Sequence, residues 1–366
     1  MPGALRQAII SIMIKRRKTR VVKVDSVRIG SPWPIVIQSM TKVLTTDVAR
    51  CLRQVRRLVS AGCSVVRIAV PTKADSVAFA KIVEKVSVPL IADIHFSAAR
   101  AIEAIEAGAA KIRLNPGNIK NRADILRIID SAKAHGAAVR IGVNEASIRD
   151  LKKADVPAGK RVGLMLQEMT KYVRLFEKAG FSDIVLSAKS ADVARTIEVN
   201  RQIAEKFSYP IHLGLTHAGL AEDAKTASAV AIGTLLAEGI GDTIRVSVAG
   251  DPVQEVLIAK EILKSLGLYK PNKPELIVCP TCGRCQIDVV KLARQVKRVL
   301  KDVNRPIRVA VMGCVVNGPG EAADADLAIC AAKGRGFIYR HGRKIKTVSS
   351  NKLIAALSRE LKGLRH

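Results

Sequence analysis

The sequence predicts an α/β protein in which a (β/α)8 barrel of the TIM type is followed by a smaller α+β domain. Up to about residue 265, short β-branched runs alternate with longer amphipathic stretches, which is the pattern of repeated strand–helix units. There are roughly eight such units, the number that a closed barrel requires. The pattern changes after a Pro- and Lys-rich joint at residues 266–275, where a cysteine-rich stretch begins.

Eight segments are expected to form the strands of the barrel. In chain order they are residues 34–40, 64–70, 89–95, 109–115, 138–144, 183–189, 210–217 and 242–250. A doubly wound open sheet is the alternative architecture. No G-x-G-x-x-G motif follows the first strand, which weakens the dinucleotide-binding version of that alternative.

The length and composition are those of a two-domain protein. The chain has 366 residues, of which 48% are hydrophobic. We expect a flexible N-terminal lead over residues 1–22, the barrel over 23–267 and the second domain over 268–366. No apolar run approaches the roughly 20 residues that span a bilayer. The beginning of the chain is the reverse of a secretory signal, and seven cysteines then indicate reduced thiols in the cytoplasm.

The net charge of +29 is the other unusual property, with 61 Lys and Arg against 32 Asp and Glu. Such a surface attracts polyanions, acidic proteins and phosphorylated metabolites alike. Aromatic residues make up only 3%, which leaves few platforms on which single-stranded nucleic acid would stack. Charge alone therefore does not select a partner.

Polar side chains recur where the predicted strands end. Five of them are cations, namely Arg67, Arg113, Arg140, Lys189 and Arg245. The others are Gln38, Asp93, His95, Asn115, Asn144 and His217. Interior strand positions normally hold Val, Ile or Leu, so repeated cations are hard to explain as packing. Barrel active sites form at the carboxyl ends of the strands, and guanidinium groups suit phosphate oxygens. We therefore expect a small, multiply anionic ligand such as a diphosphate.

The remaining polar strand ends have two possible roles. Asp93, His95, Asn115 and Asn144 would orient hydroxyl or ring oxygens of the ligand. Alternatively, Asp93 and His95 would form an internal hydrogen-bonded pair.

The second domain carries a possible metal centre. Cys279 and Cys282 have the C-x2-C spacing of metal ligands, and Cys314 follows later in the chain. A zinc ribbon normally has a second C-x2-C, which this chain lacks. Three thiolates and one other ligand fit a [4Fe–4S] cluster better. Glu321, after a Gly-Pro-Gly turn, would be that ligand or would simply begin a helix.

Four further cysteines are not needed for this centre. Cys285 would support the ligands without binding the metal, replace one of them as a ligand, or be a free thiol near the cluster, and we favour the last. Cys51, Cys63 and Cys330 lie in apolar surroundings and are expected in the core.

Several long segments resemble one family. They are "IQSMTKVLTTDV", "IADIHFSAARAI", "KIRLNPGNI", "RIGVNEASI", "EGIGDTIRVSVAGDPVQEV", "CPTCGR" and "GCVVNGPGEA". The sequence closely resembles the bacterial 4-hydroxy-3-methylbut-2-enyl diphosphate synthase family of the non-mevalonate isoprenoid pathway. The resemblance runs from about Val24 into the C-terminal region and is to the shorter, two-domain form.

The resemblance implies an iron–sulfur oxidoreductase. Its substrate would be 2-C-methyl-D-erythritol 2,4-cyclodiphosphate, opened by two-electron reduction with loss of water, and its electron donor a flavodoxin or ferredoxin. It implies a homodimer in which the barrel of one subunit meets the cluster of the other. The implied cluster ligands are Cys279, Cys282, Cys314 and Glu321. The implied substrate ligands are Arg67, Arg113, Arg140, Lys189 and Arg245, surrounded by Asp93, His95, Asn115 and Asn144.

One residue departs from the family pattern. The family usually reads T-E-A-G after the seventh strand, where the Glu is the proposed proton donor, and this chain has His217 at that position. An imidazolium can also donate a proton, so His217 would keep the role with a different pH profile, or another group would take it over.

Two rival functions are weighed against this one. A zinc-stabilised nucleic-acid-binding protein would explain the charge and the C-x2-C motif, but not the cations at the strand ends. A sugar-phosphate barrel enzyme with a structural metal module would explain the cations and the C-x2-C motif. It differs from the iron–sulfur enzyme in that its metal centre does not contact the substrate. We expect neither nucleic acid nor a membrane as a partner.

Overall fold

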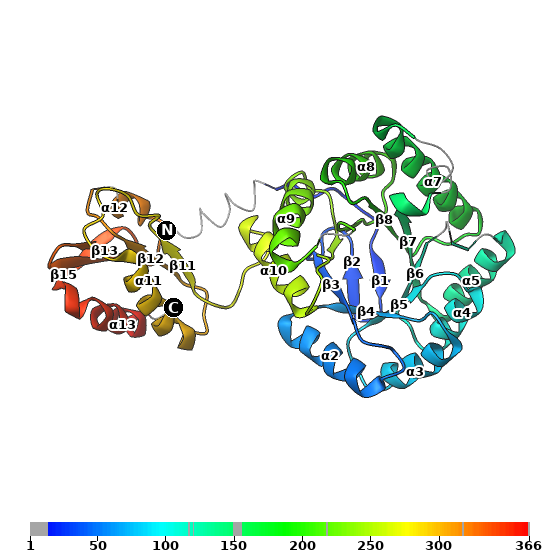
Figure 1. The fold of residues 1–366 in the computed structure, drawn as a ribbon, viewed down its shortest axis with the longest axis horizontal. Coiled ribbons are helices and arrows are strands. Elements are labelled where there is room, and N and C mark those ends of the chain that lie inside the picture. Colours follow the sequence, from blue (N-terminus) through cyan, green and yellow to red (C-terminus); the bar gives the residue numbers. More distant parts are fainter. Residues whose placement is uncertain are drawn as a thin grey trace. The chain divides into compact units, whose positions relative to one another are not determined.

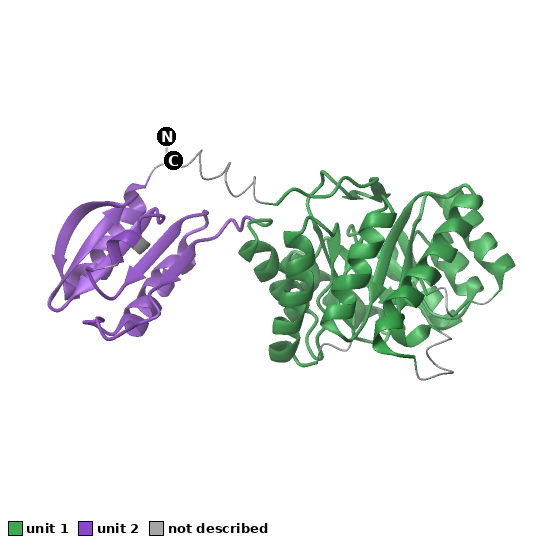
Figure 2. Ribbon diagram, turned by 90° about the horizontal axis from the view of Figure 1, so that it is seen from above, with its two compact units in different colours: residues 1–269 green, residues 270–366 purple. Residues whose placement is uncertain are grey.

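The computed structural model describes residues 14–115, 118, 119, 121–148, 156–216, 219–316 and 318–364, apart from the side chain of Glu321. His217 lies outside the described residues. The chain forms two compact units, of which the first ends at Tyr269 and the second begins at Lys270 (Figure 2). No helix of the described chain is both long and apolar enough to cross a membrane.

The first unit is a closed barrel of parallel strands (Figure 1). The strands are β3 (Val36–Met40), β4 (Val65–Ala69), β5 (Leu90–Ile94), β6 (Lys111–Leu114), β7 (Ala138–Asn144), β8 (Ile184–Lys189), β9 (His212–Leu213) and β10 (Thr243–Ile244). Each strand pairs with the next, β10 pairs with β3, and a bridge between Leu186 and Ile211 joins β8 to β9. The predicted barrel is confirmed, and the open sheet is excluded.

Helices follow the strands and surround the barrel (Figure 1). They are α2 (Val48–Ala61), α3 (Lys73–Val83), α4 (Ala98–Glu106), α5 (Arg122–His135), α7 (Ala158–Lys178), α8 (Val193–Lys206), α9 (Ala221–Ala237) and α10 (Val253–Ser265). Local sequence sets their ends. Asp47 caps α2 by accepting a hydrogen bond from the backbone of Arg50, and Gly62 ends it in the left-handed conformation.

A short hairpin closes one end of the barrel. It consists of β1 (Val22–Val24) and β2 (Val27–Ile29), and it lies across the ring in Figure 1. Its apolar side chains pack with those at the amino-terminal ends of the barrel strands, including Val36 and Val65. Because an apolar layer fills this end, the carboxyl ends of the strands are the side at which a charged ligand would bind.

The segment before the hairpin is held against the same unit. Arg16 pairs with Asp242 at 2.8 Å, and Arg17 donates to the backbone carbonyl of Tyr209 at 2.6 Å. These contacts begin inside the segment that the sequence analysis assigned to a flexible lead.

The second unit is a mixed sheet with helices on it (Figure 1). Its elements are β11 (Glu275–Val278), α11 (Val289–Val299), β12 (Arg308–Met312), α12 (Gly318–Glu321), β13 (Leu327–Ala332), β14 (Arg335–Arg340), β15 (Arg343–Ser349) and α13 (Leu353–Gly363). The first three strands are parallel, and β14 and β15 are antiparallel. Apolar residues of α11 and α13 pack on the sheet in one cluster. A second cluster includes Ala322, just after α12, and Cys330 of β13.

Candidate active site

The predicted cations come together at the carboxyl ends of the barrel strands. Arg67, Arg113, Arg140 and Lys189 are all at least nine-tenths buried. The register places Arg113 beside Arg140, and Lys189 beside Asn144. Arg245 follows β10, and its side chain is 13% exposed. Strand pairing therefore gathers charges that are at least 27 residues apart in sequence into one buried cluster.

Asp93 lies at the centre of this cluster. Its carboxylate is 3.7 Å from Arg67, 3.5 Å from Arg113 and 3.4 Å from Nε2 of His95. Burial alone would raise the pKa of Asp93, but Arg67, the hydrogen bond from His95 and Arg113 lower it well below its usual range. The carboxylate is therefore ionised and holds two guanidinium groups in place. The Asp93–His95 contact is also the internal pair considered above.

A second carboxylate, Glu255 of α10, was not predicted. Arg245 donates to both its oxygens, each at 3.0 Å, and Lys42 lies 3.1 Å from it. Ser39 donates to it at 2.8 Å. Burial opposes ionisation of Glu255, yet Arg245 and its hydrogen bonds keep the pKa below the usual value. A Glu in the first turn of a helix is ordinary, so the sequence holds no signal for this role.

Three buried basic side chains have no carboxylate partner. Within the described residues, Arg140, Lys189 and Lys111 form no ion pair with a carboxylate. Burial, followed by the neighbouring cations, lowers the pKa of Lys111 to about 7 and the pKa values of Arg140 and Lys189 well below normal. Such a positive interior costs free energy until an anion enters. The arrangement is therefore suited to a ligand with several negative charges.

Lys111 and the buried His212 were also missed by the sequence analysis. Both lie on strands inside the barrel and are 0% exposed. Lys111 is two residues before Arg113, so the alternation of a strand would have placed it on the same face. His212 carries no comparable signal, because a histidine on a buried strand is commonly a core residue.

Two glycines leave space for the cations. A Cβ on Gly142 would lie 3.4 Å from Nε of Arg113. A Cβ on Gly214 would lie 2.5 Å from both Nζ of Lys189 and the backbone oxygen of Arg245. A side chain at Gly214 would therefore displace Lys189 from its position.

Short loops fix the two asparagines. Ser147 donates to Oδ1 of Asn115 at 3.3 Å and to the backbone oxygen of Asn144 at 2.7 Å. The neighbouring Glu145 accepts a hydrogen bond from Ser190, the residue after Lys189. It also accepts from Arg161 at 3.1 Å. These contacts tie the ends of β6, β7 and β8 together.

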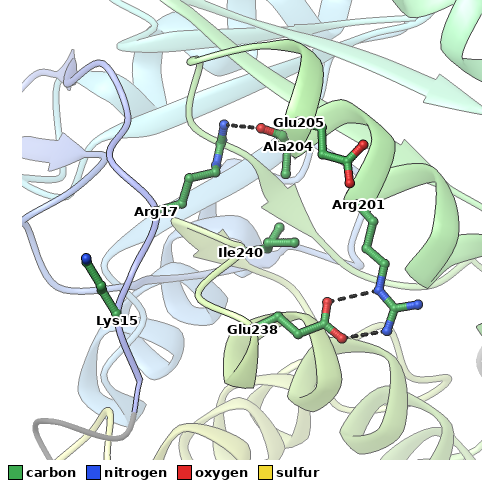
Figure 3. Close-up of a pocket in the computed structure, with 7 residues that line it drawn as sticks. All are labelled: Lys15, Arg17, Arg201, Ala204, Glu205, Glu238 and Ile240. Atoms are coloured by element: carbon green, nitrogen blue, oxygen red, sulfur yellow. Dashed lines mark hydrogen bonds and ion pairs between the residues drawn. The ribbon is translucent and has the colours of Figure 1, made fainter.

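The amino-terminal side of the barrel has an unrelated pocket of about 330 Å³ (Figure 3). It is lined by Lys15, Arg17, Arg201, Ala204, Glu205, Glu238 and Ile240. Arg201 is already neutralised by Glu238, with contacts of 2.5 and 3.0 Å. The pocket lies at the ends of α8 and α9, away from the strand ends that carry the cation cluster.

The cysteines of the second unit follow neighbouring strands. Cys279 comes directly after β11, and Cys314 lies two residues after β12, which is parallel to β11. The backbone of Cys279 donates to Val311 at 2.9 Å, and that of Gln286 to Gly313 at 3.1 Å. The loop with Cys282 and Cys285 therefore returns to the strand edge that bears Cys314.

Cys285 differs from the other three cysteines of this edge. Its thiol donates to the carbonyl of Ile287 at 3.1 Å, and it lies above Gly313, where a Cβ would be 2.4 Å from the sulfur. Cys51, Cys63 and Cys330 are buried, as predicted. Burial raises the pKa of both Cys63 and Cys330 to about 12, which makes these thiols unreactive.

The donor set fits an iron–sulfur cluster in its chemistry. All seven cysteines are free thiols, and thiolates are the usual ligands of such clusters. In the parts of the chain that are described, no three His, Cys, Asp or Glu side chains are close enough to hold a metal ion. Cys279, Cys282 and Cys314 thus share an edge without forming a closed coordination shell. Glu321 ends α12, and its side chain lies outside the described atoms.

Together, the fold and the two sites define a barrel enzyme for an anionic ligand, joined to a thiol-bearing domain. The chain matches the family models described as "GcpE TIM-barrel domain" over residues 19–260 and "GcpE protein C-terminal domain" over residues 275–363. The chain belongs to the 4-hydroxy-3-methylbut-2-en-1-yl diphosphate synthase family. The resemblance found in the sequence is confirmed, and the two rival functions receive no support.

Curated relatives are similar over nearly the whole chain. The flavodoxin-type 4-hydroxy-3-methylbut-2-en-1-yl diphosphate synthase of Nitratidesulfovibrio vulgaris is 46% identical over 349 residues, covering 95% of this chain and 90% of the relative. The enzyme of the same name from Symbiobacterium thermophilum is 46% identical over 347 residues, with coverages of 94% and 93%.

Among solved structures, dihydropteroate synthase from Stenotrophomonas maltophilia is similar with a TM-score of 0.51 and 14% identity. The aligned region covers 68% of this chain and 98% of the dihydropteroate synthase chain. This similarity concerns the barrel fold alone.

Proposed function

We propose that the protein converts 2-C-methyl-D-erythritol 2,4-cyclodiphosphate into 4-hydroxy-3-methylbut-2-enyl diphosphate. The reaction consumes two electrons and two protons, opens the cyclic diphosphate and releases one water. The observation that carries the proposal is the buried cluster of the basic side chains of Arg140, Lys189 and Lys111, which lacks carboxylate partners among the described residues. A cyclic diphosphate supplies the missing negative charge.

The barrel residues bind and orient the substrate. Arg67, Arg113, Arg140, Lys189 and Arg245 hold the diphosphate oxygens. Asp93 and Glu255 keep the guanidinium groups next to them in a fixed orientation, which reduces the entropy lost on binding. His95, Asn115 and Asn144 hydrogen-bond the hydroxyl groups. We assign His217 as a proton donor, in place of the Glu that the family usually has.

The second unit supplies the redox chemistry. Cys279, Cys282 and Cys314, with Glu321, would hold a [4Fe–4S] cluster, which transfers electrons one at a time to the substrate when bound. Cys285 does not serve as a ligand in this proposal, because its thiol already donates to a backbone carbonyl.

Flavodoxin is the proposed electron donor, and ferredoxin the alternative, since the relatives are named for flavodoxin. Both are typically acidic, and the net charge of +29 would attract them. We further propose a homodimer in which the barrel of one subunit works with the cluster of the other. We also propose a cytoplasmic location, which the thiol ligands and the reductive reaction support.

The decisive experiment begins with anaerobic purification and measures iron, acid-labile sulfide and zinc per chain. We expect about four iron and four sulfide, the content of one [4Fe–4S] cluster. Reduced flavodoxin should then support conversion of the cyclodiphosphate. Stoichiometric zinc without sulfide after attempted cluster reconstitution would overturn the proposal.

Matched variants assign the ligands. Cys314→Ala should abolish cluster assembly and turnover, because it removes a thiolate ligand. Cys330→Ala removes a buried thiol of the same unit and should keep both. Equal iron contents in the two variants would contradict the assignment of Cys314.

A further inference from the structure

Lys111 is a completely buried ionisable residue of the barrel interior. It is the first residue of β6, it is 0% exposed, and its Nζ has no hydrogen-bond partner in the described structure. A lysine in such a position is unusual, because burial of an unpaired ammonium group costs several kcal/mol or more. The cost is avoided when the side chain is a neutral amine.

The charged groups around Lys111 are almost all positive. Among the neighbouring charges, Arg140 on β7 and then Arg67 on β4 lower the pKa of Lys111 most strongly. A charge on Lys111 in turn lowers the pKa of His212 on β9. The other charged residues of the cluster are Asp93 on β5, Arg113 after Lys111 on β6, Lys189 on β8 and Arg245 after β10. Asp93 is already engaged by Arg67 and Arg113, and Glu255 by Arg245. Neither carboxylate pairs with Lys111.

We propose that Lys111 is a charge-regulating residue of the substrate site, a neutral amine in the free barrel that takes up one proton when the diphosphate binds. This inference rests on the proposed function. The proton comes from solvent and ends on Nζ of Lys111, and no covalent bond changes. Lys111 is a positioning residue, because it is enclosed and acts through Arg67 and Arg140 rather than by touching the ligand.

The direction of the proton transfer follows from electrostatics. Burial and the repulsion by Arg140 and Arg67 lower the pKa of Lys111 to about 7. A bound diphosphate neutralises those two guanidinium groups and adds negative charge, so both effects raise the pKa of the amine again. Above neutral pH, the free barrel therefore lacks a proton that the liganded barrel holds.

Other groups are poorer candidates for this proton. The guanidinium of Arg140 does not deprotonate at working pH. His212 is neutral in the free barrel, because burial and the nearby Lys189 and Arg140 hold its pKa well below normal. Lys189 is the strongest competitor, and the proposed function assigns it to the substrate ligands. Variants separate these possibilities.

The test is calorimetric titration of the full-length protein with the cyclodiphosphate at pH about 8, in two buffers of different ionisation enthalpy. The difference in heat gives the number of protons taken up. We expect nearly one proton for the unaltered protein and close to none for Lys111→Met. The dissociation constant of the unaltered protein should rise up to about tenfold per pH unit above pH 7, and that of Lys111→Met should not.

Two further variants complete the design. Lys85→Met, an exposed lysine beyond α3, should behave as the unaltered protein. Lys111→Arg keeps its charge at every pH, so it should bind without proton uptake, and it provides the test if Lys111→Met does not fold.

The outcomes separate this inference from the proposed function. Absence of binding heat with the cyclodiphosphate would overturn the proposed function and this inference with it. Binding with unchanged proton uptake in both Lys111 variants would overturn the inference alone and assign the proton to Lys189 or His212. Loss of proton uptake in the Lys111 variants, with Lys85→Met unchanged, supports it.

Discussion

Two carboxylates divide the cations of the barrel into two classes. Asp93 and Glu255 form ion pairs with Arg67, Arg113 and Arg245 at 3.0–3.7 Å, so these side chains are positioned before any ligand arrives. The remaining cations stay uncompensated. The site thus combines hydrogen-bond donors that are already in position with basic side chains that have no carboxylate partner among the described residues. Both features favour the binding of a diphosphate over that of a neutral ligand.

The first prediction concerns Glu255→Gln. Removing the carboxylate leaves Arg245 as a partly buried charge without its partner, so the free energy of unfolding should fall by about 3–5 kcal/mol. Urea unfolding at pH 7 measures this change. Glu261→Gln, on the exposed side of the same helix, is the control and should change it by under about 1 kcal/mol. Similar losses in both variants would show that Arg245 does not depend on Glu255.

The second prediction concerns Lys111→Met in the absence of ligand. The pKa of Lys111 is about 7 in the folded state and about 10.5 when unfolded. Between these values the unfolded chain binds one proton more, so the stability of the unaltered protein should gain up to about 1.4 kcal/mol per pH unit from this residue. Below pH 7 the penalty of the buried charge is fully present.

Lys111→Met should therefore be more stable than the unaltered protein at pH about 6, with an advantage that shrinks toward pH about 10. Urea unfolding at several pH values checks this. A stability difference that does not vary with pH would show that Lys111 is not neutralised in the folded barrel.

At the scale of elements, strand register and small residues shape the interior. β9 and β10 have only two residues each in regular pairing, and Gly214 follows β9 directly. The absence of a side chain there lets Lys189 cross from β8 toward the centre of the barrel. Loop contacts such as that of Ser190 with Glu145 then fix the strand ends.

The third prediction concerns Gly214→Ala. The new methyl group would be 2.5 Å from the carbonyl oxygen of Arg245, which belongs to the backbone and cannot move aside cheaply. We expect a loss of about 1–3 kcal/mol in stability and weaker substrate binding. Gly142→Ala is the matched control, since the atom nearest to its new methyl group would be Nε of Arg113, at an ordinary contact distance of 3.4 Å. The prediction fails if the two variants unfold at the same temperature.

At the scale of the whole molecule, the two units contribute different chemistry and different charge. Lys270 to the end of the chain contains 20 Lys and Arg against seven Asp and Glu. This unit also carries the proposed cluster ligands. The first unit contains 41 Lys and Arg against 25 Asp and Glu, so the second unit has the higher net positive charge per residue. This charge would attract an acidic electron donor to the unit that is proposed to hold the cluster.

The fourth prediction follows from this attraction. Turnover driven by reduced flavodoxin should slow as the salt concentration rises from about 0.05 to 0.5 M, because screening weakens the encounter. Turnover driven by a small chemical reductant serves as the control. Equal salt dependence of the two reactions would contradict electrostatic attraction of the donor.

The fifth prediction tests the shared active site. Arg140→Met and Cys314→Ser are each expected to be inactive, because one lacks a substrate ligand and the other a cluster ligand. If each barrel works with the cluster of the partner subunit, randomly mixed dimers should recover about a quarter of the normal activity. A mixture that stays inactive would indicate that both sites belong to one chain.

The sequence alone determined the fold class, the family and the cations at the strand ends. Local sequence patterns predict these features. The patterns are the alternation of strands and helices, long family motifs, and charged residues at positions that normally hold Val or Leu. Arg67 and Arg140 were found in this way. His217 and the side chain of Glu321 lie outside the described atoms, so their roles stay predictions.

Only the tertiary structure decided how those charges are balanced. The pairing of Arg245 with Glu255 depends on how α10 packs against β3 and β10, which no local pattern encodes. The neutral state inferred for Lys111 depends on the depth at which closure of the barrel places it among Arg67 and Arg140. Local sequence specifies which side chains a strand carries. Burial and neighbouring charges arise only when distant strands meet, and they determine the protonation of those side chains.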